Sequence, residues 1–342
     1  MSRVLISDPT LRDGNHAVQH SLTLAQIGAY ATAADAANIP IVEVGHGNGL
    51  AASSLQVGEA AESDRDMLVK ARECLTRSKL CIHVMPGFAT ISRDLKLAID
   101  IGVDVVRVAS HCSEADITQR HIAYVRERGK QVFGVLMMTH MVTKERLAEE
   151  ALKMESYGAE AIILMDSAGA FLPSDVVGRV TALVEALNIP VGFHAHNNLG
   201  MAIANSVTAL QSGATIVDGT ARGFGAGAGN AQLEVLVAVM HKLGYETGID
   251  LYKILDAADL AEKVLMPVVP TINSVSIVSG LAGVFSGFAK HVDRVAAQFK
   301  VDPRDVFFEL GRRSIVAGQE DLIIEVANAL ATGAGRRTEK IQ

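Results

Sequence analysis

Short apolar runs alternate with amphipathic stretches along most of the chain. A run rich in Val, Ile and Leu predicts a strand, and a following stretch with apolar residues at helical spacing predicts a helix. Eight such pairs precede residue 244. Strands are expected at Val4–Ser7, Ile39–Val44, Leu80–Met85, Val103–Ala109, Gln131–Met138, Ala159–Met165, Ile189–His196 and Thr215–Thr220. Helices are expected at 22–37, 62–78, 91–101, 115–128, 144–157, 173–187, 200–212 and 230–243.

This alternation predicts an α/β fold, a TIM (β/α)8 barrel in residues 1–264, because the strand runs are apolar at successive positions, as in strands buried on both faces. An open doubly wound sheet is the alternative. It is disfavoured because no Gly-x-Gly-x-x-Gly follows the first strand, and because polar residues gather at the carboxyl ends of nearly all the strands. Residues 265–342 are expected to form a small C-terminal α-helical domain, with helices at 282–297, 303–311 and 319–330.

Composition narrows the function classes. The 342 residues are 49% hydrophobic, enough for a large core, and no uninterrupted apolar run reaches the length of a membrane span. The formal net charge of −7 argues against a nucleic-acid partner, since the basic residues cluster only at Arg312 and Arg313 and at Arg336 and Arg337. Three unpaired cysteines and the lack of a signal pattern at the N-terminus predict a cytoplasmic protein without disulfides.

Histidines gather where the predicted strands end. Seven of the eleven fall at or just beyond the carboxyl end of a strand, and in a barrel these positions meet at one mouth. Any one of them can instead be a buried structural residue, and that interpretation is favoured for each of His46, His111 and His140 alone. The seven are His16, His46, His83, His111, His140, His194 and His196.

A metal site is predicted from three of these strand ends. His194 and His196 are separated by one residue on a strand, so both side chains point to the same side. Asp13 follows the first strand, which barrel closure brings next to the last one. An Asp-His-His set with open positions suits Mn²⁺ or Mg²⁺ holding a 2-oxo acid, and Zn²⁺ and other divalent metals stay open as alternatives.

Neighbouring residues supply the groups that carbon–carbon cleavage beside a carbonyl needs. Arg12 is always cationic and can stabilise an enolate oxygen, or it forms a structural ion pair. His16 can exchange a proton with a hydroxyl, and His20 is a rival for that role. Ser167 either binds a substrate carboxylate or caps the next helix. No Lys at a strand end is suited to an imine, which favours a metal-stabilised enolate.

Four segments together resemble the 4-hydroxy-2-oxovalerate aldolase family of the DRE-TIM metallolyases. They are Asp-Pro-Thr-Leu-Arg-Asp-Gly-Asn-His at 8–16, Met-Asp-Ser-Ala-Gly at 165–169, His-Ala-His-Asn-Asn at 194–198 and Gly-Ala-Gly-Ala-Gly-Asn at 225–230. The similarity extends nearly end to end, including Gly-Gln-Glu-Asp at 318–321.

The resemblance implies a class II pyruvate aldolase that cleaves a 4-hydroxy-2-oxo acid to pyruvate and an aldehyde. It implies Asp13, His194 and His196 as metal ligands, Arg12 for the enolate and His16 as the base. The residues expected to contact the substrate are Arg12, Ser167, His194, His83, Met85 and Phe285. It also implies an oligomer, in which the C-terminal helices contact an acylating aldehyde dehydrogenase that receives the aldehyde.

Three departures from the family pattern affect the expected substrate. Phe285 stands where the family has Tyr, which removes a phenol expected near the substrate hydroxyl and affects stereochemical control. His-Val-Met-Pro-Gly at 83–87 stands where the family has a Leu-rich segment that packs against the alkyl group of the aldehyde, which predicts a polar or larger aldehyde. The family's aromatic segment is Ser-Ser-Leu-Gln-Val-Gly at 53–58 in this chain, which opens space near the mouth.

Two other functions stay open on the sequence. One is a Claisen-type synthase of the same superfamily, resembling citramalate or isopropylmalate synthases, which condense acetyl-CoA with a 2-oxo acid. The Gly-Gln-Glu-Asp motif and the short C-terminal region favour the aldolase. The other is a catalytically silent partner of a dehydrogenase, which would not need the complete set of predicted metal ligands together with Arg12 and His16.

Overall fold

The computed structural model describes residues 3–316 and 318–333. Its strands are β1 (Leu5–Leu11), β2 (Ile41–Val44), β3 (Lys79–Val84), β4 (Val105–His111), β5 (Gln131–Met137), β6 (Ile162–Asp166), β7 (Val191–Ala195) and β8 (Ile216–Asp218). The helices of the barrel part are α1 (Gly14–Ala17), α2 (Leu24–Ala36), α3 (Asp64–Cys74), α4 (Lys96–Ile101), α5 (Gln119–Glu127), α6 (Lys144–Ser156), α7 (Pro173–Ala186), α8 (Ala202–Gln211), α9 (Leu233–Lys242) and α10 (Leu251–Leu265). The C-terminal helices are α11 (Ser274–Ala282), α12 (Ala289–Phe299), α13 (Pro303–Arg312) and α14 (Leu322–Ala331).

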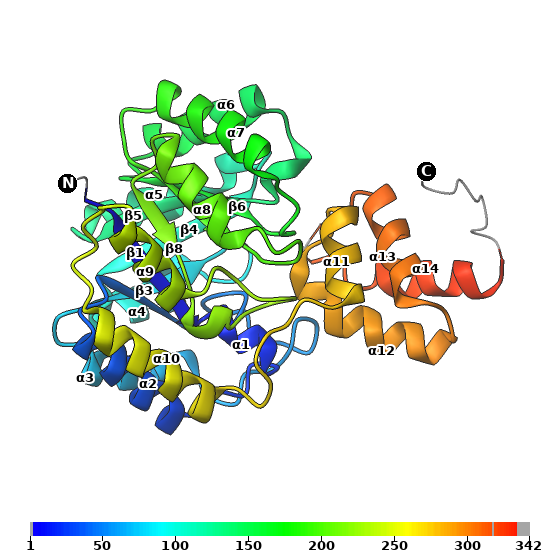
Figure 1. Ribbon diagram of the computed structural model, residues 1–342, viewed down its shortest axis with the longest axis horizontal. Helices are drawn as coiled ribbons and strands as arrows, with labels where there is room; N and C mark the ends of the chain where they lie inside the picture. The colour runs from blue at the N-terminus through cyan, green and yellow to red at the C-terminus, as the bar shows by residue number, and fades with distance from the viewer. Residues whose placement is uncertain (1–2, 317, 334–342) are drawn as a thin grey trace.

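The eight strands form a closed parallel barrel in chain order, with the helices packed around it (Figure 1). Closure joins β1 to β8, with Ser7 opposite Asp218, so the residues that follow β1 lie near the ends of β7 and β8. The lower part of the interior is apolar and includes Ile41, Phe133 and Ile163. The expected barrel fold is therefore confirmed, and the open sheet is excluded.

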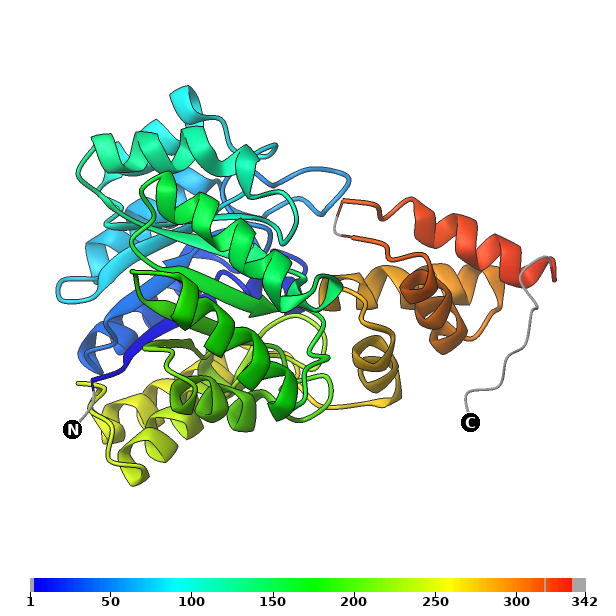
Figure 2. The same ribbon diagram turned by 90° about the horizontal axis from the view of Figure 1, so that it is seen from above.

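Helices α11–α14 form a lobe with an apolar core of its own, which includes Phe288, Phe307 and Ile323. Figure 2 shows this lobe beyond one end of the barrel. Contacts place it at the end where the strands finish, since the imidazole Nε2 of His140 lies 2.9 Å from the carbonyl oxygen of Gly283. The boundary between residues 264 and 265 stays a prediction, and residues 334–342, with Arg336 and Arg337, lie outside the described part.

One expected helix is wrong, and the structure contains helices that were not expected. The helix expected at 282–297 is broken: α11 ends at Ala282, Gly283 takes a left-handed conformation with φ of 65°, and α12 begins at Ala289. The 15-residue helix α10 was not expected, and it packs against α2 and α9.

The basic cluster of the lobe is used within the lobe. Arg312 pairs with Glu309, and Arg313 pairs with Glu309 and Glu325. Among residues 3–316 and 318–333, no helix has both the length and the apolar character required to cross a membrane.

Candidate active site

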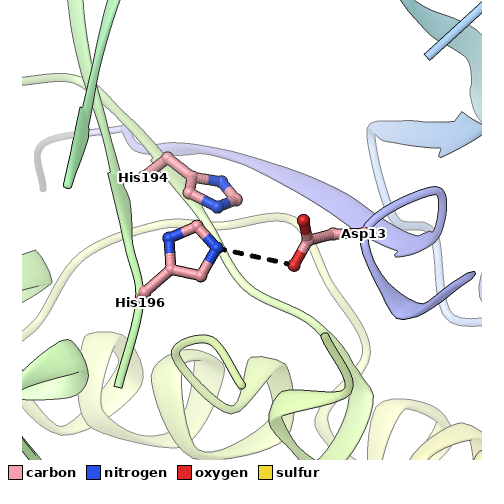
Figure 3. A group of neighbouring side chains, drawn as sticks. All are labelled: Asp13, His194 and His196. Carbon is pink, nitrogen blue, oxygen red and sulfur yellow. Dashed lines mark ion pairs between the residues drawn. The ribbon is translucent and has the colours of Figure 1, made fainter. Parts of the chain in front are cut away.

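Three potential metal ligands meet at the mouth of the barrel. Asp13 comes from the end of β1, His194 lies in β7 and His196 follows directly after it (Figure 3). One ligand atom from each lies within 4.8 Å of the others, and Nε2 of His196 is 3.7 Å from Oδ2 of Asp13. All three side chains are buried. The predicted set is thus brought together in one place.

The hydrogen bonds of the two imidazoles leave one nitrogen of each ring free. Nδ1 of His194 is 2.8 Å from the Asp218 carboxylate, and Nδ1 of His196 is 2.9 Å from the carbonyl oxygen of Asp166. Both partners accept, so each Nδ1 carries the proton and each Nε2 carries a lone pair. Neither Nε2 has a hydrogen-bond partner among the described residues. Two buried lone pairs facing one carboxylate fit a divalent cation.

The third ligand is held as a carboxylate. Oδ2 of Asp13 accepts from Nδ2 of Asn230 at 2.5 Å, and Oδ1 accepts from Nη1 of Arg12 at 2.8 Å. Burial would raise the pKa of Asp13, but Arg12 and His196 outweigh it and hold the pKa below its ordinary value. A Cβ on Gly225 would lie 2.3 Å from Oδ2 of Asp13, so only glycine permits this approach.

The glycine-rich loop at 223–229 lies beside Asp13. Its amides are used inside the protein: the amide of Ala226 points to Oδ2 of Asp13 at 3.4 Å, and the amide of Ala228 donates to Oδ1 of Asn198 at 3.0 Å. The negative charge that this loop meets is therefore the carboxylate of Asp13.

Arg12 lies in a buried ion pair and still has a free donor. Its Nε donates to Glu43, and Nη1 contacts Asp13 and the carbonyl oxygen of Gly47. Nη2 has no partner among the described residues. Arg12 therefore has both the structural ion pair and a donor available to a substrate oxygen.

His16 and His20 differ in their hydrogen bonds. His20 stacks on His46 at 3.6 Å, its Nε2 donates to the carbonyl oxygen of Val57, and its Nδ1 accepts from the amide of Gly47. Both nitrogens of His20 are occupied. No such bond holds the ring of His16 within the described chain, and it lines a cavity of about 640 Å³ between barrel and lobe. Loss of water around His16 lowers its pKa to about 4, so the ring is neutral at neutral pH.

Ser167 is held by both parts of the molecule. Its Oγ accepts from the amide of Met138 at 2.9 Å, which leaves its own proton free to donate. Its carbonyl oxygen accepts from Oγ of Ser286, in the lobe, at 3.0 Å. The cap of the following segment is instead Asp166, whose carboxylate accepts from the amides of Ala170 and Phe171.

The remaining predicted residues lie on two sides of the site. Phe285 lines the cavity, and its ring centroid is 6.3 Å from that of His16 in an edge-on arrangement. His83 is buried inside the barrel with Nδ1 4.0 Å from Glu43, and burial lowers its pKa to about 3. Met85 packs on the apolar cluster inside the barrel.

Sequence reasoning did not single out Glu43, Arg107, Asp218 or Asn230. Glu43, Arg107 and Asp218 are fully buried charged residues in strands. Glu43 and Arg107 each stand alone among apolar neighbours, in Ile-Val-Glu-Val and Val-Val-Arg-Val, and this isolated charge was a signal that the sequence did contain.

Comparison with known proteins identifies the family. Residues 3–261 match the HMGL-like family and residues 270–332 match the DmpG-like communication domain. The chain is 63% identical over 340 residues to a 4-hydroxy-2-oxovalerate aldolase from Pectobacterium atrosepticum, covering 99% of both chains. It is 64% identical over 333 residues to one from Spirochaeta aurantia, covering 97% of this chain and 98% of the relative. This chain belongs to the 4-hydroxy-2-oxovalerate aldolase family.

The aldolase is a carbon–carbon lyase, and the family resemblance seen in the sequence is confirmed. Its C-terminal lobe contains the communication domain. The carboxyl transferase domain of Rhizobium etli pyruvate carboxylase shares the fold, with a TM-score of 0.81 at 17% identity, over 97% of this chain and 61% of that one. The named relatives favour an aldolase over the condensing synthase.

Proposed function

We propose that the chain cleaves 4-hydroxy-2-oxo acids to pyruvate and an aldehyde at the site formed by Asp13, His194 and His196. The observation that carries the proposal is the pair of buried, unpartnered Nε2 atoms of His194 and His196 facing Asp13. Arg12 and His16 lie beside this set with a free donor and a neutral ring.

The residues divide the work of a retro-aldol cleavage. His16 takes the proton of the 4-hydroxyl, the bond between C3 and C4 breaks, and the electron pair moves to the 2-oxo oxygen as an enolate. The free Nη2 of Arg12 donates to that oxygen as its charge grows. The hydroxyl of Ser167 donates a hydrogen bond to the substrate carboxylate. The proton that His16 took is then returned to C3 of the enolate, which gives pyruvate and restores neutral His16.

The donor set of one carboxylate and two imidazoles suits Mn²⁺ or Mg²⁺, and other divalent metals are alternatives. When bound by Asp13, His194 and His196, the cation would polarise the 2-oxo group as a Lewis acid. The ring of His194 would also contact the substrate held there.

His83, Met85 and Phe285 are proposed to contact the aldehyde half of the substrate. A neutral, buried imidazole with an unpartnered Nδ1 can bond to a polar substituent, which favours a polar or larger aldehyde over acetaldehyde. The name of the relatives points to the five-carbon 4-hydroxy-2-oxovalerate, so the preference among chain lengths is a property to measure.

An acylating aldehyde dehydrogenase is proposed as the partner of the communication domain, in a cytoplasmic oligomer. The support is the match of residues 270–332 to a DmpG-like communication domain and the position of the cavity between this lobe and the barrel. A silent scaffold is disfavoured because it would not need the unpartnered donors around Asp13.

The test is pyruvate release from racemic 4-hydroxy-2-oxo acids of graded length and polarity. The protein is first stripped of metal with a chelator and is then assayed with and without added Mn²⁺. Pyruvate that depends on Mn²⁺ is expected, and the best acid reports what His83 and Phe285 accept. No pyruvate from any acid would overturn the proposal. A release of free thiol from acetyl-CoA with a 2-oxo acid would support the synthase instead.

A further inference from the structure

A chain of buried charged groups crosses the interior of the barrel beneath the site. Arg12 pairs with Glu43, Glu43 pairs with Arg107, Arg107 pairs with Asp218, and Asp218 bonds to His194. The distances from Arg107 are 3.0 Å from Nη1 to Oε2 of Glu43 and 2.7 Å from Nη2 to Oδ2 of Asp218. Each of these side chains is buried.

We infer that Arg107 is a positioning residue that holds the metal ligand His194 and the enolate-binding Arg12 in one fixed arrangement. The inference rests on the proposed function for the roles of Arg12 and His194. Arg107 itself has both Nη atoms engaged by carboxylates, and it lies among the interior residues of β4. It therefore acts through its neighbours.

The position of Arg107 explains why an arginine is required. Glu43 lies in β2, Asp218 in β8 and Arg107 in β4, and no two of these strands are direct neighbours in the barrel, so no backbone hydrogen bond joins one of them to another. The planar guanidinium presents two separate Nη donors and can hold two carboxylates at once, which the single ammonium of lysine does less well. Two buried carboxylates without this cation would be strongly unfavourable.

Arg107 and the two carboxylates that it holds, Glu43 and Asp218, form a bridge with two arms. One arm runs from Arg107 through Asp218 to the metal ligand His194. Oδ2 of Asp218 accepts both from Nη2 of Arg107 and from Nδ1 of His194. This bond fixes the tautomer and the orientation of His194, so that Nε2 faces Asp13. His196 is held differently, by the backbone carbonyl of Asp166, and does not depend on the bridge.

The other arm reaches Arg12. Oε2 of Glu43 binds Arg107, and Oε1 binds Nε of Arg12. With Nε held there and Nη1 held by Asp13, the guanidinium of Arg12 has a single orientation, and Nη2 stays free for the substrate. Loss of the bridge at Arg107 would let Glu43 turn and would change this orientation.

Arg107→Lys in the full-length chain tests the inference by two readouts. Calorimetric titration of the chelated protein with Mn²⁺ alone is expected to show affinity reduced about tenfold or more, the range for loss of a residue that orients a metal ligand. The kcat for pyruvate release at saturating Mn²⁺ is expected to fall as well, because Arg12 is misplaced. A residue that only stabilises the fold would lower Tm and leave both values unchanged, and that result would overturn the inference.

Asp218→Asn provides the second variant, should Arg107→Lys fail to fold. It keeps Arg107 paired with Glu43 and removes the carboxylate charge that Arg107 and His194 share. Weaker Mn²⁺ binding is therefore expected, and unchanged binding would overturn that arm. In the double variant the two losses of Mn²⁺ affinity should not multiply, because both act through Asp218. Losses that multiply would show that Arg107 does not act through Asp218.

Arg72→Lys is the matched control. Arg72 pairs with Asp104 at 2.8 Å, outside the site, and its replacement should change neither Mn²⁺ affinity nor kcat.

The Mn²⁺ titrations need no substrate, so they separate the proposed function from the proposed role of Arg107. Suppose that wild-type protein releases no pyruvate while the Arg107 and Asp218 variants bind Mn²⁺ weakly. The proposed function then fails, and the role of Arg107 in positioning the metal ligand His194 is supported. If wild type releases pyruvate and Arg107→Lys matches it, only the role of Arg107 fails.

Discussion

At the scale of single residues, the histidines of the mouth fall into two groups according to their ring nitrogens. His20 and His46 use both nitrogens for backbone groups and stack on each other, so they shape the loop from 46 to 58. His83, His140, His194 and His196 each keep one buried nitrogen without a partner among the described residues. Because a buried unpartnered nitrogen is unfavourable, the second group is better suited to bind a ligand than the first.

Replacement of Asp13 and of Arg12 should have separable effects. Asp13→Ala removes one of three ligands, so Mn²⁺ binding and pyruvate release are expected to disappear together. Arg12→Ala leaves all three ligands, so Mn²⁺ binding should remain while kcat falls by roughly 10² to 10³, about 3 to 4 kcal/mol, as for a lost oxyanion donor. Titration with Mn²⁺ and initial rates on the same preparations measure both. Normal turnover by either variant would remove its assigned role.

Phe285→Tyr should change the choice between hydroxyl enantiomers. The new phenol would lie near His16, whose ring centroid is 6.3 Å from that of Phe285, and would add one hydrogen-bonding group there. A bond worth about 1 kcal/mol changes a ratio of kcat/KM values roughly fivefold. Rates with the separated enantiomers test this, with Mn²⁺ affinity expected to be unchanged. Equal ratios in both proteins would mean that position 285 does not control stereochemistry.

The sequence allowed the metal set to be predicted, because spacing on a strand and barrel closure decide where Asp13, His194 and His196 lie. It could not separate His16 from His20, since that difference depends on which backbone groups approach each ring. The carbonyl oxygen of Val57 and the amide of Gly47 are brought to His20 only by the folded loop.

At the scale of elements, Asp35 joins α2 to the connection between α3 and β3. Its carboxylate accepts from the amides of Thr76, Arg77 and Ser78 and from the hydroxyl of Thr76. Burial would raise the pKa of Asp35, but these bonds outweigh it and lower the pKa from 3.8 to about 2. The folded state therefore favours the charged carboxylate.

Asp35→Asn should destabilise the protein by about 2 kcal/mol at neutral pH, the typical value for hydrogen bonds to a charged group. Because the folded pKa is the lower one, this contribution is present above pH 3.8 and is lost as pH falls towards 2. The difference in Tm between variant and wild type should thus shrink below about pH 4. Mn²⁺ affinity serves as the control and should not change. A Tm difference independent of pH would contradict the assignment.

Elements with uniform burial were predictable, and elements set by a local break were not. The strands were predicted correctly because both of their faces are buried, which gives each strand a continuous apolar run in the sequence. The helix expected at 282–297 failed because the sequence pattern does not reveal the left-handed turn at Gly283, which ends α11 and turns Phe285 and Ser286 towards the barrel.

At the scale of the whole molecule, the site is formed by the barrel and the C-terminal lobe together. Phe285 lines the cavity beside His16, and the hydroxyl of Ser286 donates to the carbonyl oxygen of Ser167 while it accepts from Nδ2 of Asn198 at 2.8 Å. The segment between α11 and α12 therefore holds the loop that carries the proposed carboxylate-binding serine. A shift of the lobe would move Ser167.

Ser286→Ala should weaken substrate binding without affecting the metal. The change removes one hydroxyl and leaves the carbonyl oxygen of Ser167 and the amide of Asn198 each with one bond fewer, so the Ser167 loop is less well held. A loss of about 1 kcal/mol would raise KM roughly fivefold, while Mn²⁺ affinity stays as in wild type because Asp13, His194 and His196 do not contact Ser286. Ser156→Ala, which removes a surface hydroxyl on α6, is the matched control and should leave both KM and Mn²⁺ affinity unchanged.

A raised KM in Ser286→Ala alone would mean that the lobe sets the geometry of the substrate site. A protein bound to the lobe could then alter catalysis through this segment. An unchanged KM would mean that the barrel holds Ser167 by itself.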